Sequence, residues 1–78
     1  MDRRAMILEV IEGVSGKKLT VAPDASLFES GILDSFALAD VVTALEVAFQ
    51  VKIPDADLSP RRFDSLLRIE SYLESRGK

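Results

Sequence analysis

The chain has 78 residues, a formal net charge of −3 and 47% hydrophobic residues, and it contains neither cysteine nor histidine. The missing side chains exclude disulfides and thiolate or imidazole metal sites, and they remove the usual general base near neutral pH. The acidic balance disfavours nucleic-acid binding, which needs a concentrated basic face. This length predicts one domain, residues 1–78, of marginal stability.

No apolar run approaches the roughly 20 residues that cross a bilayer. The N-terminal segment Met1-Asp2-Arg3-Arg4 opens an amphipathic stretch rather than a signal peptide. We therefore expect a cytoplasmic, monomeric protein without a membrane span. Met1 and the absence of linker sequence favour a discrete protein over a domain excised from a larger protein.

The first helix is predicted from about Asp2 to Val14. Its apolar residues recur at the spacing of one helical face: Ile7, Val10, Ile11 and Val14. Asp2 is the expected N-cap, and Gly13 or Gly16 is the expected end of the helix.

Residues 16–34 form a long connection whose apolar residues follow no steady period: Leu19, Val21, Leu27, Phe28, Ile32 and Leu33. A loop of this length is unusual in a compact domain, which indicates a functional loop. We expect the pairs Leu27-Phe28 and Ile32-Leu33 to anchor it across the bundle. Ser26 and Glu29 have the capping-box spacing, which predicts a short helical turn inside the loop.

The second helix is predicted to begin at Asp34 or Ser35, one of which caps it, and to stop before Pro54. It carries the cleanest apolar stripe in the chain: Leu38, Val41, Val42, Leu45 and Phe49. A short helical turn is predicted between Pro54 and Leu58.

Ser59-Pro60 is a favoured pair for an N-cap and a first helical residue, so the last helix is predicted to begin there and to end near Gly77. Its apolar residues are Phe63, Leu66, Leu67, Ile69, Tyr72 and Leu73. Strand signals are weak throughout. The expected fold is all-α: a small bundle of three main helices plus a short fourth, with a long first loop.

Ser35 stands at a helix start, where backbone N–H groups lack helical partners. From Asp34-Ser35-Phe36 alone, a helix cap is the favoured interpretation, because Asp and Ser are among the commonest caps. A catalytic serine would need an adjacent base, usually His, and the chain has none. A serine hydrolase is therefore disfavoured.

The wider segment Leu27-Phe28-Glu29-Ser30-Gly31-Ile32-Leu33-Asp34-Ser35-Phe36 resembles the attachment-site signature of acyl carrier proteins and peptidyl carrier domains. That signature reads approximately Leu-Phe, two variable residues, Gly, two apolar residues, then Asp-Ser and an apolar residue. Further matching residues follow in order: Ala44-Leu45-Glu46, Phe49, Ile53-Pro54-Asp55, Leu58, Phe63, Ser65 and Ile69. The resemblance covers nearly the whole chain.

The resemblance implies an acyl-carrier-like bundle that is a carrier and not an enzyme. It implies that a separate phosphopantetheinyl transferase moves 4′-phosphopantetheine from coenzyme A to Ser35, and that Asp34 helps. The thiol of that arm would hold acyl or aminoacyl groups as thioesters for loading and downstream biosynthetic enzymes. A phosphodiester at a helix start gains about 0.3–1 kcal/mol from the macrodipole, which Asp34 opposes as a like charge.

Two features differ from the fatty-acid carriers of that family: Phe36 stands where Leu is commoner, and Ala37, Val47 and Ala48 stand where acids are frequent. Partner contacts are expected along the second helix: Phe36, Ala37, Asp40 and Glu46. For the two carboxylates a merely solvated face is an equal alternative. Because of the two differences from the fatty-acid carriers, we expect the protein to serve a polyketide, nonribosomal peptide or related pathway. The alternatives are a housekeeping fatty-acid carrier and an unmodified helical interaction module.

Overall fold

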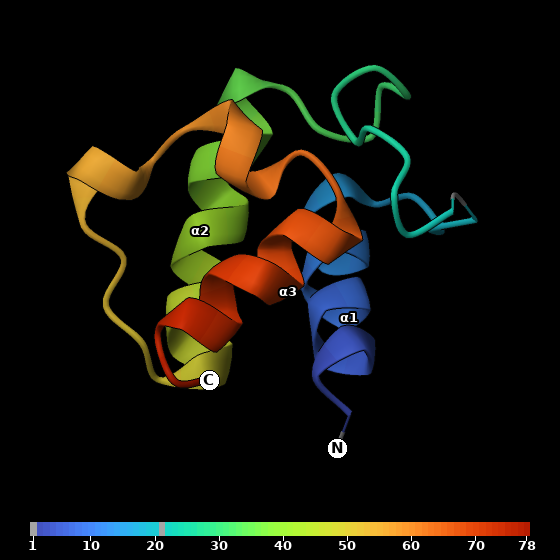
Figure 1. The fold of residues 1–78 in the computed structure, drawn as a ribbon. Coiled ribbons are helices and arrows are strands. Elements are labelled where there is room, and N and C mark those ends of the chain that lie inside the picture. Colours follow the sequence, from blue (N-terminus) through green and yellow to red (C-terminus); the bar gives the residue numbers. More distant parts are fainter. Residues whose placement is uncertain (1, 21) are drawn as a thin grey trace.

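The computed structural model describes residues 2–20 and 22–78, and all of its regular elements are helical (Figure 1). The elements are α1 (Arg3–Ser15), α2 (Ser35–Phe49), the short 3-10 helices η1 (Asp55–Asp57) and η2 (Pro60–Phe63), and α3 (Leu66–Ser75). No strand occurs in the described ranges. The predicted all-α bundle is confirmed, although Val21 of the predicted loop lies outside the described residues.

A single cluster of buried side chains joins the helices, because α1 packs against both α2 and α3, and η2 packs against α2 and α3. The predicted helical stripes supply most of it: Ile7, Ile11, Leu38, Val41, Val42, Leu45, Leu66, Ile69 and Leu73. Phe63 of η2 is fully buried among them. Within residues 2–20 and 22–78, none of the helices has the length and apolarity to cross a bilayer.

The ends of α1 follow the predicted signals only in part. Gly16 ends the helix in the left-handed conformation, with φ 71°, and its N–H donates to the carbonyl of Glu12. Residues with a Cβ rarely adopt this conformation, which explains why a glycine stands at this position. Asp2 occupies the N-cap position, but its side chain accepts no capping hydrogen bond.

The last helix begins later than predicted. Ser59 and Pro60 do form a cap-and-proline pair, in which Ser59 Oγ accepts the N–H of Arg61 at 3.3 Å, but this pair opens η2. The chain then bends, and α3 starts afresh with Ser65 as its N-cap. Ser65 Oγ accepts the N–H of Arg68 at 3.2 Å.

The bend has a physical cause in the long loop. The carbonyl of Asp64 accepts the N–H of Leu27 at 2.6 Å, so it is not available to continue a helix. The carboxylate of Asp64 also accepts a hydrogen bond from the hydroxyl of Ser26 at 2.6 Å. The loop before α2 is thereby fastened to the residue that precedes the cap of α3.

The predicted turn after Pro54 is η1, which is held against α3 by one side-chain contact. The hydroxyl of Tyr72 donates to Asp57 Oδ2 at 2.7 Å, and the Tyr72 ring lies 5.3 Å from that of Phe63. Burial and the hydrogen bond to the Asp57 carboxylate raise the pKa of the Tyr72 phenol above its ordinary value of 10.0. The connection between α2 and α3 is therefore not a free loop.

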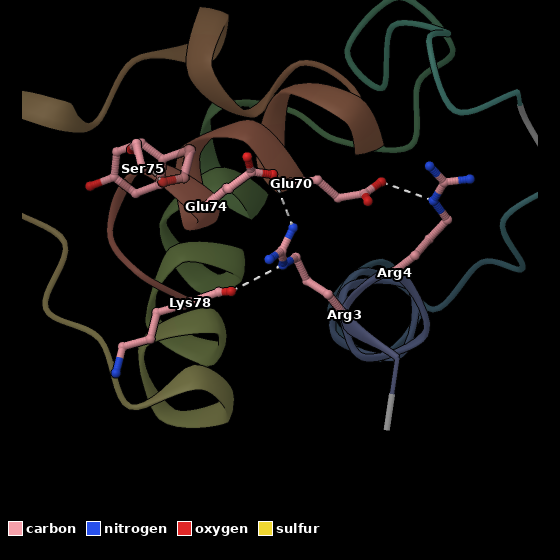
Figure 2. A network of polar contacts seen from close by, with 7 residues as sticks. Arg3, Arg4, Glu70, Glu74, Ser75 and Lys78 are labelled. Atoms are coloured by element: carbon pink, nitrogen blue, oxygen red, sulfur yellow. Dashed lines mark hydrogen bonds and ion pairs between the residues drawn. The ribbon is translucent and has the colours of Figure 1, made fainter.

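Polar contacts close the end of the bundle where α1 begins and α3 finishes (Figure 2). Arg4 Nε lies 2.8 Å from Glu70 Oε2, Arg3 pairs with Glu74 at 3.4 Å, and Arg3 Nε donates to the carbonyl of Lys78 at 3.1 Å. Ion pairs at the protein surface contribute up to about 1 kcal/mol each. The start of α2 lies at the opposite end of the bundle (Figure 1).

Candidate functional site

Ser35 is the first residue of α2 and is exposed to solvent. The N-cap is its neighbour Asp34, whose Oδ1 accepts the N–H of Ala37 at 2.8 Å. Of the two predicted caps, Asp34 is therefore the one that the structure uses. Among the described residues no hydrogen bond engages the Ser35 hydroxyl, which leaves that oxygen available for chemistry.

The start of α2 favours an anion next to Ser35. The helix presents its positive dipole end and its unpaired first-turn N–H groups there. No lysine or arginine lies within α2, so the side chains of this helix add no positive charge to that of its backbone. An exposed hydroxyl beside free N–H donors fits a phosphodiester, although the carboxylate of Asp34 repels one.

The loop before Ser35 is anchored at two points by buried side chains. Leu27 is fully buried and Leu33 is 2% exposed, while Phe28 and Ile32 pack against the core from its edge. The N–H groups of Ile32 and Leu33 both donate to the carbonyl of Leu27, at 3.1 and 3.0 Å. The two predicted anchor pairs are confirmed, and the second of them leads directly into Asp34-Ser35.

A turn lies between these anchors, as the capping-box spacing predicted. Ser26 Oγ accepts the N–H of Glu29 at 3.1 Å, and Gly31 follows with φ 81°, a conformation that other residues resist. Lys17 Nζ donates to the carbonyl of Gly31 at 3.1 Å. The sequence reasoning missed this lysine contact, because no local pattern links residues so far apart.

The predicted partner-contact residues do not share one environment. Phe36 is 86% exposed and Asp40 is exposed one turn further along, on the face that also presents Val47 at 76% exposure. Ala37, which was predicted as a partner contact, is half-buried, because it lies one turn before the buried Val41 and packs against the core.

Glu46 has an internal contact that the sequence did not suggest. It is half-buried, and its Oε2 accepts the N–H of Ile53 at 2.8 Å. That bond fastens the extended segment that follows α2. Phe36 and Asp40 are therefore the more accessible members of the predicted partner face.

Ser65 and Asp64, which hold the loop and the start of α3, were missed as an anchoring pair. A signal was present: Ser65 directly precedes the apolar residues Leu66, Ile69 and Leu73 at helical spacing, the position expected of an N-cap. The Ser59-Pro60 pair is the stronger cap signature, and it obscured this second one.

Comparison with known proteins identifies the family of the chain. The family described as phosphopantetheine attachment site matches residues 5–73. The chain belongs to this family.

Similar proteins include two named D-alanyl carrier protein. One, from Lactobacillus acidophilus, is 24% identical over 75 residues, which cover 96% of this chain and 95% of that protein. Another, from Streptococcus sanguinis, is 32% identical over 54 residues, which cover 69% of this chain and 68% of that protein.

The chain is therefore a carrier protein whose cofactor is covalently attached 4′-phosphopantetheine. When bound, this group supplies a terminal thiol that holds acyl or aminoacyl cargo as a thioester. Carrier proteins are not themselves catalytic; they work with a phosphopantetheinyl transferase and with loading and biosynthetic enzymes. Family membership supports the carrier interpretation over an unmodified interaction module.

Proposed function

We propose that Ser35 is the attachment residue and that this protein carries an aminoacyl or acyl group on the arm joined to it. The observation that supports this most strongly is that one residue at the start of α2 caps the helix and a different one presents an exposed hydroxyl. Asp34 caps the helix through its bond to Ala37, so the exposed Ser35 hydroxyl has no structural bond to lose when it is modified. Attachment of the arm should therefore change the stability of the folded state only slightly.

In the attachment step, the Ser35 oxygen bonds to the phosphorus that bears the pantetheine arm of coenzyme A. The hydroxyl proton leaves, and the pyrophosphate bond of coenzyme A breaks to release adenosine 3′,5′-bisphosphate. The free N–H groups at the start of α2 stabilise the phosphodiester that results. Asp34 aids this step at the transferase, in addition to capping α2.

Partner enzymes dock on the exposed face of α2. Phe36 supplies an apolar contact beside the attachment point, and Asp40 steers basic partner surfaces toward it. Ala37 and Glu46 contribute from the margins of this face, since both are half-buried. A cytoplasmic location and a monomeric state stay predictions.

The cargo that has most support is an amino acid, with D-alanine first, because relatives that span nearly the whole chain are named D-alanyl carrier protein. Related peptide or polyketide pathways form the wider class. A housekeeping fatty-acid role has less support, because Asp40 and Glu46 are the only acids within α2.

The attachment proposal is tested by intact mass after incubation with a phosphopantetheinyl transferase and coenzyme A. The native chain should gain one phosphopantetheine group, and Ser35→Ala should gain none. Ser30→Ala is the matched control, because Ser30 is also exposed and lies in the same segment. Loading of Ser35→Ala would place the arm elsewhere and overturn the assignment.

The cargo is tested separately on the loaded protein. Incubation with a D-alanine-activating enzyme, ATP and D-alanine should add one alanyl group, whereas malonyl and long-chain acyl donors with their own transferases should add nothing. Acylation by a long-chain donor alone would favour the fatty-acid role.

A further inference from the structure

An open groove of about 590 Å³ runs along the outer side of α3. Its walls come from the long loop, η2 and α3, and none of its lining residues belongs to α2. The lining side chains that matter here are Asp24, Arg62, Leu67, Arg68 and Ser71. The groove is thus separate from the exposed face of α2.

Two exposed arginines flank the groove without ion-pair partners. In residues 2–20 and 22–78, the guanidinium groups of Arg62 and Arg68 form neither an ion pair nor a hydrogen bond. They differ in this from Arg3 and Arg4, which are both paired with carboxylates. In a protein of net charge −3, the groove is a local basic site.

The groove also has an apolar surface. Leu67 is 44% exposed, although it belongs to a helix whose other leucines, Leu66 and Leu73, are buried. The hydroxyl of Ser71 lies one turn further along α3 and is exposed. Basic, apolar and hydroxyl groups are therefore arranged along one side of a short helix.

We propose that this groove docks an acidic segment of a partner protein, with carboxylates on Arg62 and Arg68 and an apolar side chain over Leu67. Charge complementarity selects an acidic occupant, because guanidinium groups match carboxylates in shape and charge. The open form and the mixed lining favour a polypeptide over a small anion, which is better held in an enclosed site. Asp24 opposes the occupant and restricts its carboxylates to the arginine side.

This inference goes beyond the carrier function and does not rest on Ser35. A partner held at α3 leaves the face of α2 free for a second enzyme. The expected role is retention of one enzyme while another acts on the cargo.

The test is a titration of the isotopically labelled full chain with a synthetic peptide, acetyl-Glu-Leu-Glu-Asp-Leu-Glu-amide, followed by amide NMR shifts. We expect shifts at residues 66–75 and weaker binding at higher salt. The double variant Arg62→Gln with Arg68→Gln should bind roughly tenfold more weakly. Asp24→Asn should bind more tightly, because it removes the opposing carboxylate.

Arg61→Gln is the matched control, because Arg61 neighbours Arg62 but does not line this groove. It should leave the affinity unchanged, and a peptide with lysine in place of its acids should not bind. The proposal is overturned if no shifts appear at millimolar peptide, if they are confined to α2, or if the double variant binds like the native chain. Ser35→Ala should bind as the native chain does, so loss of the attachment assignment would leave this result standing.

Discussion

Two serines stand at the starts of α2 and α3, and they are used in opposite ways. Ser65 is 5% exposed, and its Oγ accepts the N–H of Arg68, so it is the cap of α3. Ser35 is exposed and follows the cap, because Asp34 accepts the N–H of the first turn instead. A serine at a helix start is therefore structural or available for chemistry according to which residue caps the helix.

The same loop supports both helix starts. It donates two hydrogen bonds to Asp64, one from the N–H of Leu27 and one from the hydroxyl of Ser26, and then leads through Leu33 into Asp34. The buried start of α3 thus acts as the fixed point from which the exposed start of α2 is positioned.

The largest effect is expected from Leu27→Ala, which removes the fully buried anchor between the two helix starts. Truncating a buried leucine costs about 2–5 kcal/mol of unfolding free energy. Leu67→Ala is the control, because Leu67 is 44% exposed and should cost much less. Urea unfolding of both variants gives the comparison; equal costs would show that the loop is not anchored through the core.

A smaller effect is expected from Tyr72→Phe, which removes the hydrogen bond that holds η1 to α3. A hydrogen bond to a carboxylate contributes about 1.5–3 kcal/mol, and we expect the lower end because Asp57 is half exposed. The raised pKa of Tyr72 also sets a pH dependence, because the folded state holds the phenol proton more tightly than the unfolded chain does.

The stability contributed by this shift is complete below the unfolded pKa near 10.0 and is lost as the pH rises through the folded pKa. Unfolding free energies measured from pH 8 to about pH 11 should therefore fall for the native chain. Tyr72→Phe should remove most of that fall, and an equally steep fall in the variant would contradict the role of Tyr72.

The two serines themselves supply the next comparison. Ser65→Ala should cost about 1 kcal/mol, because it removes a cap and leaves the N–H of Arg68 without its acceptor. Ser35→Ala should change the unfolding free energy by less than about 0.5 kcal/mol, because no fold contact is lost. A Ser35 variant as unstable as the Ser65 variant would mean that the Ser35 hydroxyl does support the fold.

The helices could be predicted from sequence because their apolar residues repeat at helical spacing, as Leu38, Val41 and Leu45 do. The position of Ser35 followed from the same reasoning, since it stands where such a stripe begins. The start of α3 was placed too early, because Ser59-Pro60 is the stronger cap signature and the contact between Leu27 and Asp64, which are remote in sequence, leaves no local pattern.

The partial burial of two predicted partner residues could not be read from local sequence for a similar reason. Glu46 carries a charge that suggests solvent exposure, but its carboxylate accepts the N–H of Ile53 on the segment after α2. Ala37 is small enough to fit either side of a helix, and only the packing of the bundle decides that it is half-buried. Local patterns predict elements well, whereas contacts between elements decide which side chains stay accessible.

The smallest effect on stability is expected from Asp34→Asn, which separates the two roles assigned to that residue. Asparagine caps a helix about as well as aspartate, so its amide oxygen should still accept the N–H of Ala37. The unfolding free energy should change by less than about 0.5 kcal/mol, whereas Asp34→Ala should lose about 1 kcal/mol with the cap.

The rate of phosphopantetheine attachment to Asp34→Asn then tests the helper role alone, because the helix start is intact and only the negative charge is gone. If the carboxylate assists the transferase, this variant should load more slowly than the native chain at equal stability. If it loads at the native rate while Asp34→Ala is slow, then Asp34 acts only as a cap. In that case the carboxylate of Asp34 would contribute to attachment only by holding the start of α2 in place.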